Sequence, residues 1–233
     1  MAARPPRITE STRDNTYIVI AAYYESDHIA DVIAGLHSAG YENIVVVNDG
    51  SDRDTTREAQ SAGATVLEHA VNRGQGAALR TGMEYALRHG AEYIVTFDAD
   101  GQHQAGEVDD MITPIRHGDA DITIGKRFER TAEIPFAKRV VLYGAILFQF
   151  ILTGVWLSDA HNGFRAMSRD AAETLDIKQD RMGHATEIIE YIKRYDLEYK
   201  EVPVTITYDD EDGQSVWNAI NIARKNLFHK FFK

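Results

Sequence analysis

The feature that most constrains the fold is an alternation of short apolar segments with longer segments whose apolar residues recur at helical spacing. Strand-like runs, rich in β-branched residues, occupy residues 17–22, 43–47, 64–67, 93–97 and 121–124, and helical patterns follow several of them (27–39, the stretch after 48–52, and 75–89). Strands alternating with helices predict an α/β fold with a mostly parallel sheet covered on both faces. Further strands are expected at 163–168 and 197–208, with a helix over 185–195.

Composition narrows the class of protein. The 233 residues suit one domain, and the absence of cysteine excludes disulfides and thiolate chemistry. The net charge of −11 argues against nucleic acid as a partner. Residues 1–16 lack the apolar stretch of a secretory signal and are expected to be a flexible segment of a cytoplasmic protein.

The acidic surface has an unusual make-up, since Asp exceeds Glu by 20 to 16 and Arg exceeds Lys by 17 to 8. At molar salt the Debye length falls to about 3 Å, so the self-repulsion of such a surface is screened. Adaptation to a halophile's salt is one hypothesis. An ordinary acidic protein remains the alternative.

Two aspartates follow the strand at 93–97, in the sequence Asp98-Ala99-Asp100-Gly101. The carboxyl edge of a parallel sheet is where open α/β folds bind ligands, and residues two apart in extended backbone project to the same side. Carboxylate oxygens suit Mg²⁺ or Mn²⁺, with water and diphosphate oxygens filling the other positions. The alternative is an Asp-rich turn that closes the strand.

Two other strand ends carry polar groups. Asp49 and Asp52 follow the strand at 43–47 and are candidates to accept hydrogen bonds from a base or a ribose. Ser51 and Asp54 have the spacing of a helix capping box. The first strand ends in AAYYE, which puts Ala22, Tyr23 and Glu25 on the same rim. Glu25 also fits a first-turn helix acid.

Three arginines are candidate anion ligands. Arg73 precedes Gly74 in NRGQG, a turn into a helix that exposes N–H groups able to receive phosphate, although a plain loop explains it equally well. Arg127 and Arg165 suit bidentate phosphate binding or salt bridges. Asp159 is a candidate general base or a carboxylate that orients an arginine, and His103 lies beside the aspartate pair.

Two apolar segments suggest contact with a membrane surface. Residues 140–157 carry no charge, but a transmembrane span would separate the motifs on either side of it, so a buried or interfacial helix broken near Gly154 is expected. Residues 216–233 predict an amphipathic, basic helix suited to a bilayer interface or to packing on its own domain.

The ordered set AAYYE, VVNDGSDRD, NRGQGAALRTG, TFDADGQH, IGKRF, SDAHNGFRAMS and EVPVTI resembles family 2 inverting glycosyltransferases, above all dolichyl-phosphate mannose synthase and related polyprenyl-phosphate enzymes. The resemblance implies a GT-A fold over 17–215, peripheral attachment to the cytoplasmic face of a membrane, a nucleotide-diphosphate sugar as donor and a polyprenyl phosphate as acceptor.

The resemblance also implies roles for residues. Asp98, Asp100 and Gln102 would form the metal site, Arg127 and Arg165 would contact phosphates, and Asp159 falls near the position of the base. The nucleoside and donor phosphates would be bound by residues of the motifs above, namely Ala22, Tyr23, Glu25, Asp49, Asp52, Arg73, Gly74, Ala99 and Arg127.

One departure concerns the acceptor. Polyprenyl-phosphate enzymes usually carry a basic residue after the VPV strand, whereas here Tyr208, Asp209 and Asp210 stand there, although Gly213 and Ser215 match. A sugar or protein hydroxyl therefore remains an alternative acceptor, and a non-catalytic nucleotide-sugar-binding homologue remains an alternative function. A nucleotidyltransferase is disfavoured because YYESD replaces the glycine-rich loop after the first strand, and a phospho-receiver domain because receivers are about half as long.

Overall fold

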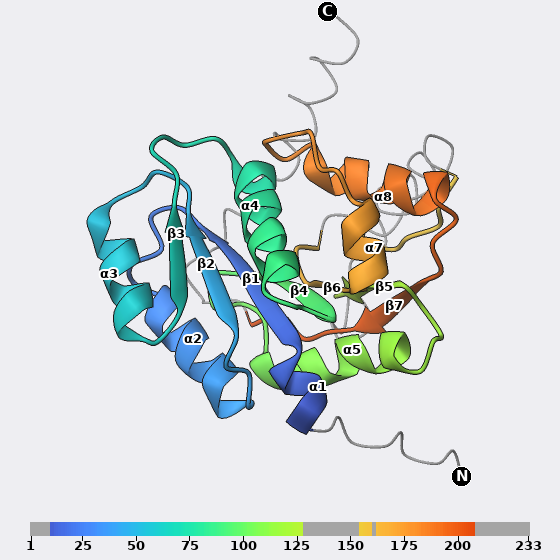
Figure 1. The fold of residues 1–233 in the computed structure, drawn as a ribbon, viewed down its shortest axis with the longest axis horizontal. Coiled ribbons are helices and arrows are strands. Elements are labelled where there is room, and N and C mark those ends of the chain that lie inside the picture. The colour runs from blue at the N-terminus through green and yellow to red at the C-terminus, as the bar shows by residue number, and fades with distance from the viewer. Residues whose placement is uncertain (1–9, 128–153, 160–161, 208–233) are drawn as a thin grey trace, which may run out of the picture.

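The computed structural model describes residues 10–127, 154–159 and 162–207. Their centre is a seven-stranded sheet of order β3-β2-β1-β4-β6-β5-β7 (Figure 1). The strands are β1 (Thr16–Ala22), β2 (Ile44–Asn48), β3 (Thr65–Glu68), β4 (Tyr93–Asp98), β5 (Ile122–Lys126), β6 (Arg165–Ser168) and β7 (Tyr199–Pro203). Only β6 runs antiparallel to its neighbours β4 and β5 within this sheet. The prediction of a mostly parallel α/β sheet is confirmed.

Helices cover both faces of the sheet (Figure 1). One apolar core lies under α2 (Ile29–Ser38), α3 (Arg53–Ser61) and α5 (Val108–Arg116), which follows a 3₁₀ turn at Ala105–Glu107. The other lies under α4 (Gln75–Arg88), α7 (Arg169–Thr174) and α8 (His184–Arg194). The side chains of β1 alternate between the cores: Ile18 and Ile20 pack in the first and Val19 in the second. This two-sided burial explains why β1, β2 and β4 are so apolar.

The expected elements are present within a few residues of their predicted bounds, including the strand at β6 and the helix at α8. The sequence pattern missed α5 and α7. Helix α5 contains Pro114, and α7 is only six residues long, so neither gave a clear helical signal. Pro114 has no N–H to donate within α5, and it lies in the last turn of that helix.

Part of the N-terminal segment expected to be flexible belongs to the domain. Residues Glu10–Asp14 form α1, and Arg13 donates to Asp109 of α5 at 2.6 Å (NH2 to Oδ2). Tyr41 also donates to Asp109. Residues Glu10–Asp14 are therefore helical and tied to α5 by an ion pair, while the division of the chain at residues 16 and 215 stays a prediction.

The two segments expected at a membrane fall largely outside the described residues: most of 140–157 and all of 216–233, together with Gly213 and Ser215. Among the residues that are described, no helix is both long enough and apolar enough to cross a bilayer.

Candidate active site

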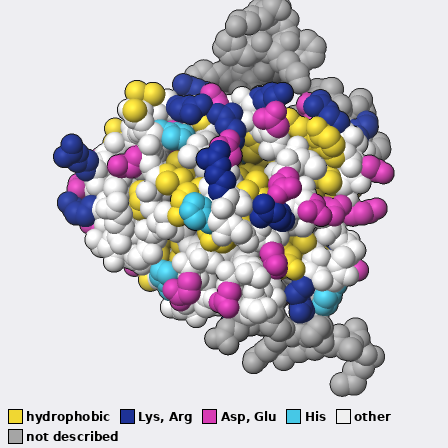
Figure 2. Space-filling view, in the orientation of Figure 1, with side chains coloured by type: hydrophobic (Ala, Val, Ile, Leu, Met, Phe, Trp, Pro, Cys, Tyr) yellow, Lys and Arg dark blue, Asp and Glu magenta, His cyan; other side chains and the backbone are white. Residues whose placement is uncertain are grey.

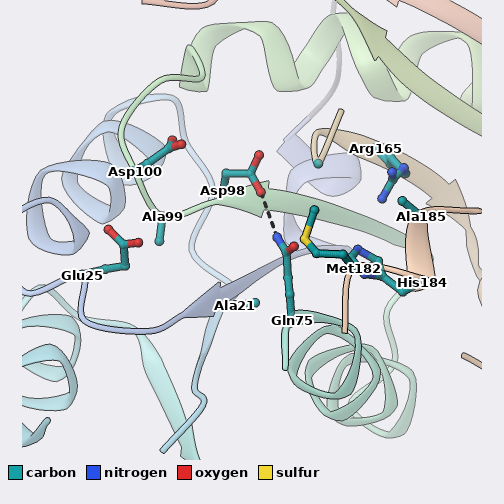
Figure 3. Close-up of a pocket in the computed structure, with 11 residues that line it drawn as sticks. Ala21, Glu25, Gln75, Asp98, Ala99, Asp100, Arg165, Met182, His184 and Ala185 are labelled. Carbon is teal, nitrogen blue, oxygen red and sulfur yellow. Dashed lines mark hydrogen bonds between the residues drawn. The ribbon is translucent and has the colours of Figure 1, made fainter. Parts of the chain in front are cut away.

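A polar pocket of about 260 Å³ opens at the carboxyl ends of β1 and β4 (Figure 3). These strands are register partners at Ala21 and Asp98, so both residues reach the pocket. The described residues that line the pocket come from these strand ends, the start of α4, the start of β6 and the start of α8: Ala21, Glu25, Gln75, Asp98, Ala99, Asp100, Gly163, Arg165, Met182, His184 and Ala185.

Asp98 lies at the centre of this pocket (Figure 3). Its Oδ2 is 3.0 Å from His103 Nε2, and its Oδ1 accepts from Gln75 Nε2 at 3.4 Å. Burial opposes ionisation of the carboxyl, but the hydrogen bond from His103, with the charges of Arg165 and Arg127, outweighs it and lowers the pKa of Asp98. Asp98 is therefore held as a carboxylate.

The pKa values of the other two acids of the pocket, Glu25 and Asp100, are raised. Burial, followed by the charges of neighbouring acids, raises the pKa of Glu25, and burial with the charge of Asp98 raises that of Asp100. Positive charge in the pocket would relieve this repulsion. Asp98 and Asp100 are hard oxygen donors, so the residues present fit a divalent cation.

The described residues include no group of three or more His, Cys, Asp or Glu placed to hold a metal ion. Further ligands would have to be water and diphosphate oxygens, as the sequence led us to expect. Gln102, the third predicted ligand, is not among the described residues lining the pocket. Its N–H donates to Asp100 Oδ1 at 3.0 Å, and its carbonyl accepts from Thr207.

Two arginines bring positive charge near the acids. Arg165, at the start of β6, is 1% exposed and lines the pocket, and burial lowers its pKa to about 10 despite the opposing charges of Asp98 and Asp159. Arg127, at the end of β5, donates to Asp159 from Nε at 2.5 Å and from NH2 at 2.6 Å.

Both carboxylate oxygens of Asp159 are therefore engaged by Arg127, which leaves the residue poorly placed to act as a general base. It is 5% exposed, and the backbone N–H of Arg127 also donates to its Oδ2 at 3.3 Å. Of the two predicted roles, the structure matches the carboxylate that orients an arginine, although the partner is Arg127 and not Arg165. Glu201 of β7 fixes this segment by accepting from the N–H groups of Ser158 and Asp159.

Asp49 follows β2 but does not line the pocket. It is 3% exposed, and its oxygens accept from the N–H groups of Arg73 (3.0 Å) and Gly74 (2.6 Å) and lie 2.6 Å from His69 Nδ1. These contacts use the acceptors that were expected to meet a base or ribose. In this structure Asp49 instead anchors the loop that precedes α4.

The same contacts correct the expectation for NRGQG. The N–H groups of Arg73 and Gly74 are bound by Asp49, and that of Ala77 donates to the carbonyl of Asp180 at 3.1 Å. A Cβ on Gly74 would lie 2.3 Å from that carbonyl oxygen. The glycine thus permits close backbone packing, and the turn does not present these N–H groups to a phosphate. The guanidinium Nη2 of Arg73 lies 4.0 Å from Oδ1 of Asp180.

The helix cap at α3 was assigned to the wrong residue. Asp52 is the N-cap, and its Oδ1 accepts from the N–H and hydroxyl of Thr55 at 2.9 and 2.8 Å. Ser51 instead donates to Asn48 Oδ1. The cap expected from Ser51 is therefore made by Asp52, while the binding of the nucleoside by Asp52 stays a prediction.

The remaining candidates are Ala22, Tyr23 and Ala99. Ala22 packs in the core and its carbonyl accepts from Asp49 N–H, because strand alternation turns Ala21 and not Ala22 to the pocket. Tyr23 is 46% exposed and contacts Tyr24 edge to face, while Ala99 lines the pocket.

Sequence reasoning missed several pocket residues. Strand alternation could have indicated Ala21, and Gln75 stands within a motif already singled out. Met182 and His184 had no local signal, since tertiary packing alone brings α8 to the strand ends. His184 is 3% exposed, its Nδ1 lies 2.9 Å from the carbonyl of Arg181, and burial chiefly lowers its pKa.

Figure 2 shows Lys and Arg side chains interspersed with Asp and Glu over the face that carries α4. Ion pairs account for part of this mixture. Arg80 of α4 lies 3.2 Å from Asp180, which joins α4 to the segment before α8. The wall of the pocket formed by Met182 and His184 is thus tied to the helix opposite.

Comparison with known proteins assigns the chain to a family. Residues 17–176 match the family model described as glycosyl transferase family 2, and the chain belongs to this family. The protein is therefore a glycosyltransferase by descent.

Relatives match along nearly the whole chain. An uncharacterised protein of Methanocaldococcus jannaschii is 34% identical over 240 residues, covering 100% of this chain and 99% of that protein. The UDP-N-acetylglucosamine–dolichyl-phosphate N-acetylglucosaminyltransferase of Methanococcus voltae is 30% identical, covering 93% and 96%. The polyprenol monophosphomannose synthase of Mycolicibacterium smegmatis is 27% identical, covering 97% and 89%.

A solved structure shows the same fold. Glucosyl-3-phosphoglycerate synthase from Mycobacterium tuberculosis, crystallised with Mn²⁺ and UDP-glucose, superposes with a TM-score of 0.68 at 18% identity, covering 97% of this chain and 84% of that one. The expected GT-A fold is confirmed.

Proposed function

We propose that the protein transfers a sugar from a nucleotide-diphosphate donor to a polyprenyl phosphate, inverting the configuration of the anomeric carbon. The observation that carries this proposal is the convergence of Glu25, Asp98 and Asp100 with Arg165 on one pocket at the ends of β1 and β4. The names of the relatives from Methanococcus voltae and Mycolicibacterium smegmatis support the same acceptor class.

In the proposed reaction an oxygen of the lipid phosphate attacks the anomeric carbon. The bond from that carbon to the donor diphosphate breaks, and the nucleoside diphosphate leaves with the bonding electrons. Asp98 and Asp100 would hold Mg²⁺ or Mn²⁺, which supplies positive charge against the departing diphosphate. Arg165 places a buried positive charge at the same pocket.

The state of Asp159 favours a phosphate acceptor. A phosphate arrives ionised and needs no base, whereas a hydroxyl must lose a proton. Both oxygens of Asp159 accept from Arg127, so this carboxylate is poorly placed to take a proton. Its role here is to orient Arg127, whose guanidinium carries charge toward the pocket from the end of β5.

A hydroxyl acceptor is the second candidate, and His184 is the observation that favours it. If Nδ1–H donates to the carbonyl of Arg181, the neutral ring carries its lone pair on Nε2. A pKa lowered by burial keeps the ring neutral at pH 7. His184 lines the pocket and would serve as the base in place of Asp159.

A panel of UDP- and GDP-sugars with Mn²⁺ first identifies the donor by thermal stabilisation, since a ligand at 100 times its dissociation constant adds about 2.7 kcal/mol. Transfer is then measured to a short polyprenyl phosphate and to the matching polyprenol. We expect a glycosyl phosphate product of inverted configuration by NMR, from the phosphate only. Transfer to the alcohol alone would replace this proposal by the hydroxyl acceptor, and stabilisation without any transfer would leave a nucleotide-sugar-binding protein.

The proposed acceptor also gives a location. A polyprenyl phosphate resides in a membrane, so we propose that the protein acts as a peripheral protein at the cytoplasmic face. Flotation with liposomes tests this directly, and absence of the protein from the floated fraction would contradict it.

A further inference from the structure

The orientation of Asp98 depends on His103, a residue that does not line the donor pocket. We propose that His103 is a positioning residue: its Nε2–H holds Oδ2 of Asp98 so that Oδ1 is directed to the cation and diphosphate. This inference rests on the proposed metal-dependent function, and it gives the histidine a role distinct from that of a metal ligand.

The contact is short and shielded from solvent. His103 Nε2 lies 3.0 Å from Asp98 Oδ2, and the histidine side chain is 3% exposed. The ring is fixed by its neighbours, since its centroid lies 5.6 Å from that of Phe97 and 5.1 Å from that of Phe164. The backbone of His103 also forms a bridge with Ile206. A side chain held in this way cannot follow the carboxylate if it rotates.

The surroundings of the ring decide which nitrogen carries the hydrogen. Nδ1 of His103 is buried and has no hydrogen-bond partner among the described residues. A hydrogen on Nδ1 would therefore be a buried donor without an acceptor, which costs about 1–3 kcal/mol. A ring with a single hydrogen avoids this cost by carrying it on Nε2, where Asp98 accepts it.

The same arrangement argues against direct metal binding by His103. Nε2 is engaged by Asp98, and Nδ1 is enclosed by protein, so neither nitrogen is open to the pocket. His103 therefore contacts Asp98 without lining the pocket itself.

A glycine also lies close to the carboxylate of Asp98. A Cβ on Gly163 would lie 2.2 Å from Asp98 Oδ1 and 2.4 Å from Oδ2, so the glycine backbone lies directly against the carboxylate. Asp98 thus lies close against Gly163 as well as His103. Confinement lowers the entropy lost when the carboxylate binds a cation, and partners of this kind typically contribute 10–100-fold to metal affinity (order of magnitude).

The test compares two substitutions in the full chain. His103→Gln places an amide N–H near the position of Nε2 and keeps the donor. His103→Phe keeps an aromatic ring against Phe97 and Phe164 but removes the donor. Binding of Mn²⁺ alone is measured from the loss of the free-ion electron paramagnetic resonance signal, with Asp98→Asn marking the loss of the site. We expect wild type and His103→Gln to agree within about threefold, and His103→Phe to bind about 10–100-fold more weakly.

Each failure has a distinct signature. If His103→Phe binds Mn²⁺ as tightly as wild type, the positioning role is wrong while the metal site stands. If His103→Gln and His103→Phe lose affinity equally at unchanged melting temperature, the donor is not what matters and the inference also falls. If wild type binds no more Mn²⁺ than Asp98→Asn, the metal site itself fails, and the inference with it. Should His103→Phe not fold, His103→Leu replaces it in the same comparison.

Discussion

Two guanidinium nitrogens of Arg127 donate to the buried carboxylate of Asp159, Nε to Oδ2 at 2.5 Å and Nη2 to Oδ1 at 2.6 Å. The two side chains therefore form a bidentate ion pair. Such pairs have fixed geometry as well as strength. This ion pair joins the end of β5 to the segment before β6. Asp159, one of whose two predicted roles was that of a general base, instead orients the guanidinium of Arg127.

This pair leads to the first prediction. Asp159→Asn is expected to lower kcat by only a few-fold, because the amide still fills the site and no proton needs removal from a phosphate acceptor. Loss of a general base would instead cost about 10²–10⁴-fold. Steady-state rates with the identified donor distinguish the two. Asp54→Asn, on the exposed surface of α3, serves as the matched control. A loss in the larger range would restore Asp159 as the base.

The second prediction concerns the space beside Asp98. Gly163→Ala is expected to reduce kcat by about 100-fold, since its Cβ would displace the Asp98 carboxylate and misplacement by about 1 Å can cost this much. Gly106→Ala is the control, because a Cβ there meets no atom within 4 Å. Melting temperatures verify that both variants are folded. Equal rates in the two variants would show that Asp98 has room to adjust.

The third prediction separates an anchor from a ligand at Asp49. Asp49→Ala leaves the partly buried donors of Arg73, Gly74 and His69 without their acceptor, and we expect a loss of about 3 kcal/mol in the free energy of unfolding. Urea denaturation measures it. The exposed Asp54→Ala should change stability by less than about 0.5 kcal/mol. Weaker donor binding at unchanged stability would return Asp49 to the nucleoside site.

The fourth prediction tests the acidic surface. A net charge of −11 repels itself at low ionic strength, and molar KCl reduces the Debye length to about 3 Å. If the composition reflects adaptation to salt, the melting temperature should rise by several degrees between low salt and molar KCl. A higher melting temperature at low salt would favour an ordinary acidic protein.

The sequence predicted the fold because β1, β2 and β4 are buried on both faces and are therefore continuously apolar. β2 and β4 were recognisable for this reason, and so was the place of Asp98, which follows β4 directly. The helix that contains Pro114 and the six-residue α7 were missed, because a short or interrupted period gives a weak pattern.

Local reasoning failed where two residues compete for one role. Ser51 and Asp52 both follow β2 and both can cap a helix, and only the backbone path of the turn selected Asp52. Ala21 and Ala22 are identical in type, and the strand's phase alone turned Ala21 to the pocket.

The sequence by itself determined the alternation of strands and helices, and with it the position of the aspartate pair at a sheet edge, because both depend on residues close in the chain. The tertiary structure alone decided which groups meet those aspartates. His184 is 86 positions from Asp98 along the chain, and Arg127 is 32 positions from Asp159, so their meeting depends on how α8 and β5 pack on the sheet. Packing also engaged hydrogen-bonding groups of Asp49 and Asp52 that the sequence had left open. The partners that packing brings to each carboxyl, His103 and the arginines at Asp98 and the charge of Asp98 at Asp100, lower the pKa of Asp98 while that of Asp100 is raised.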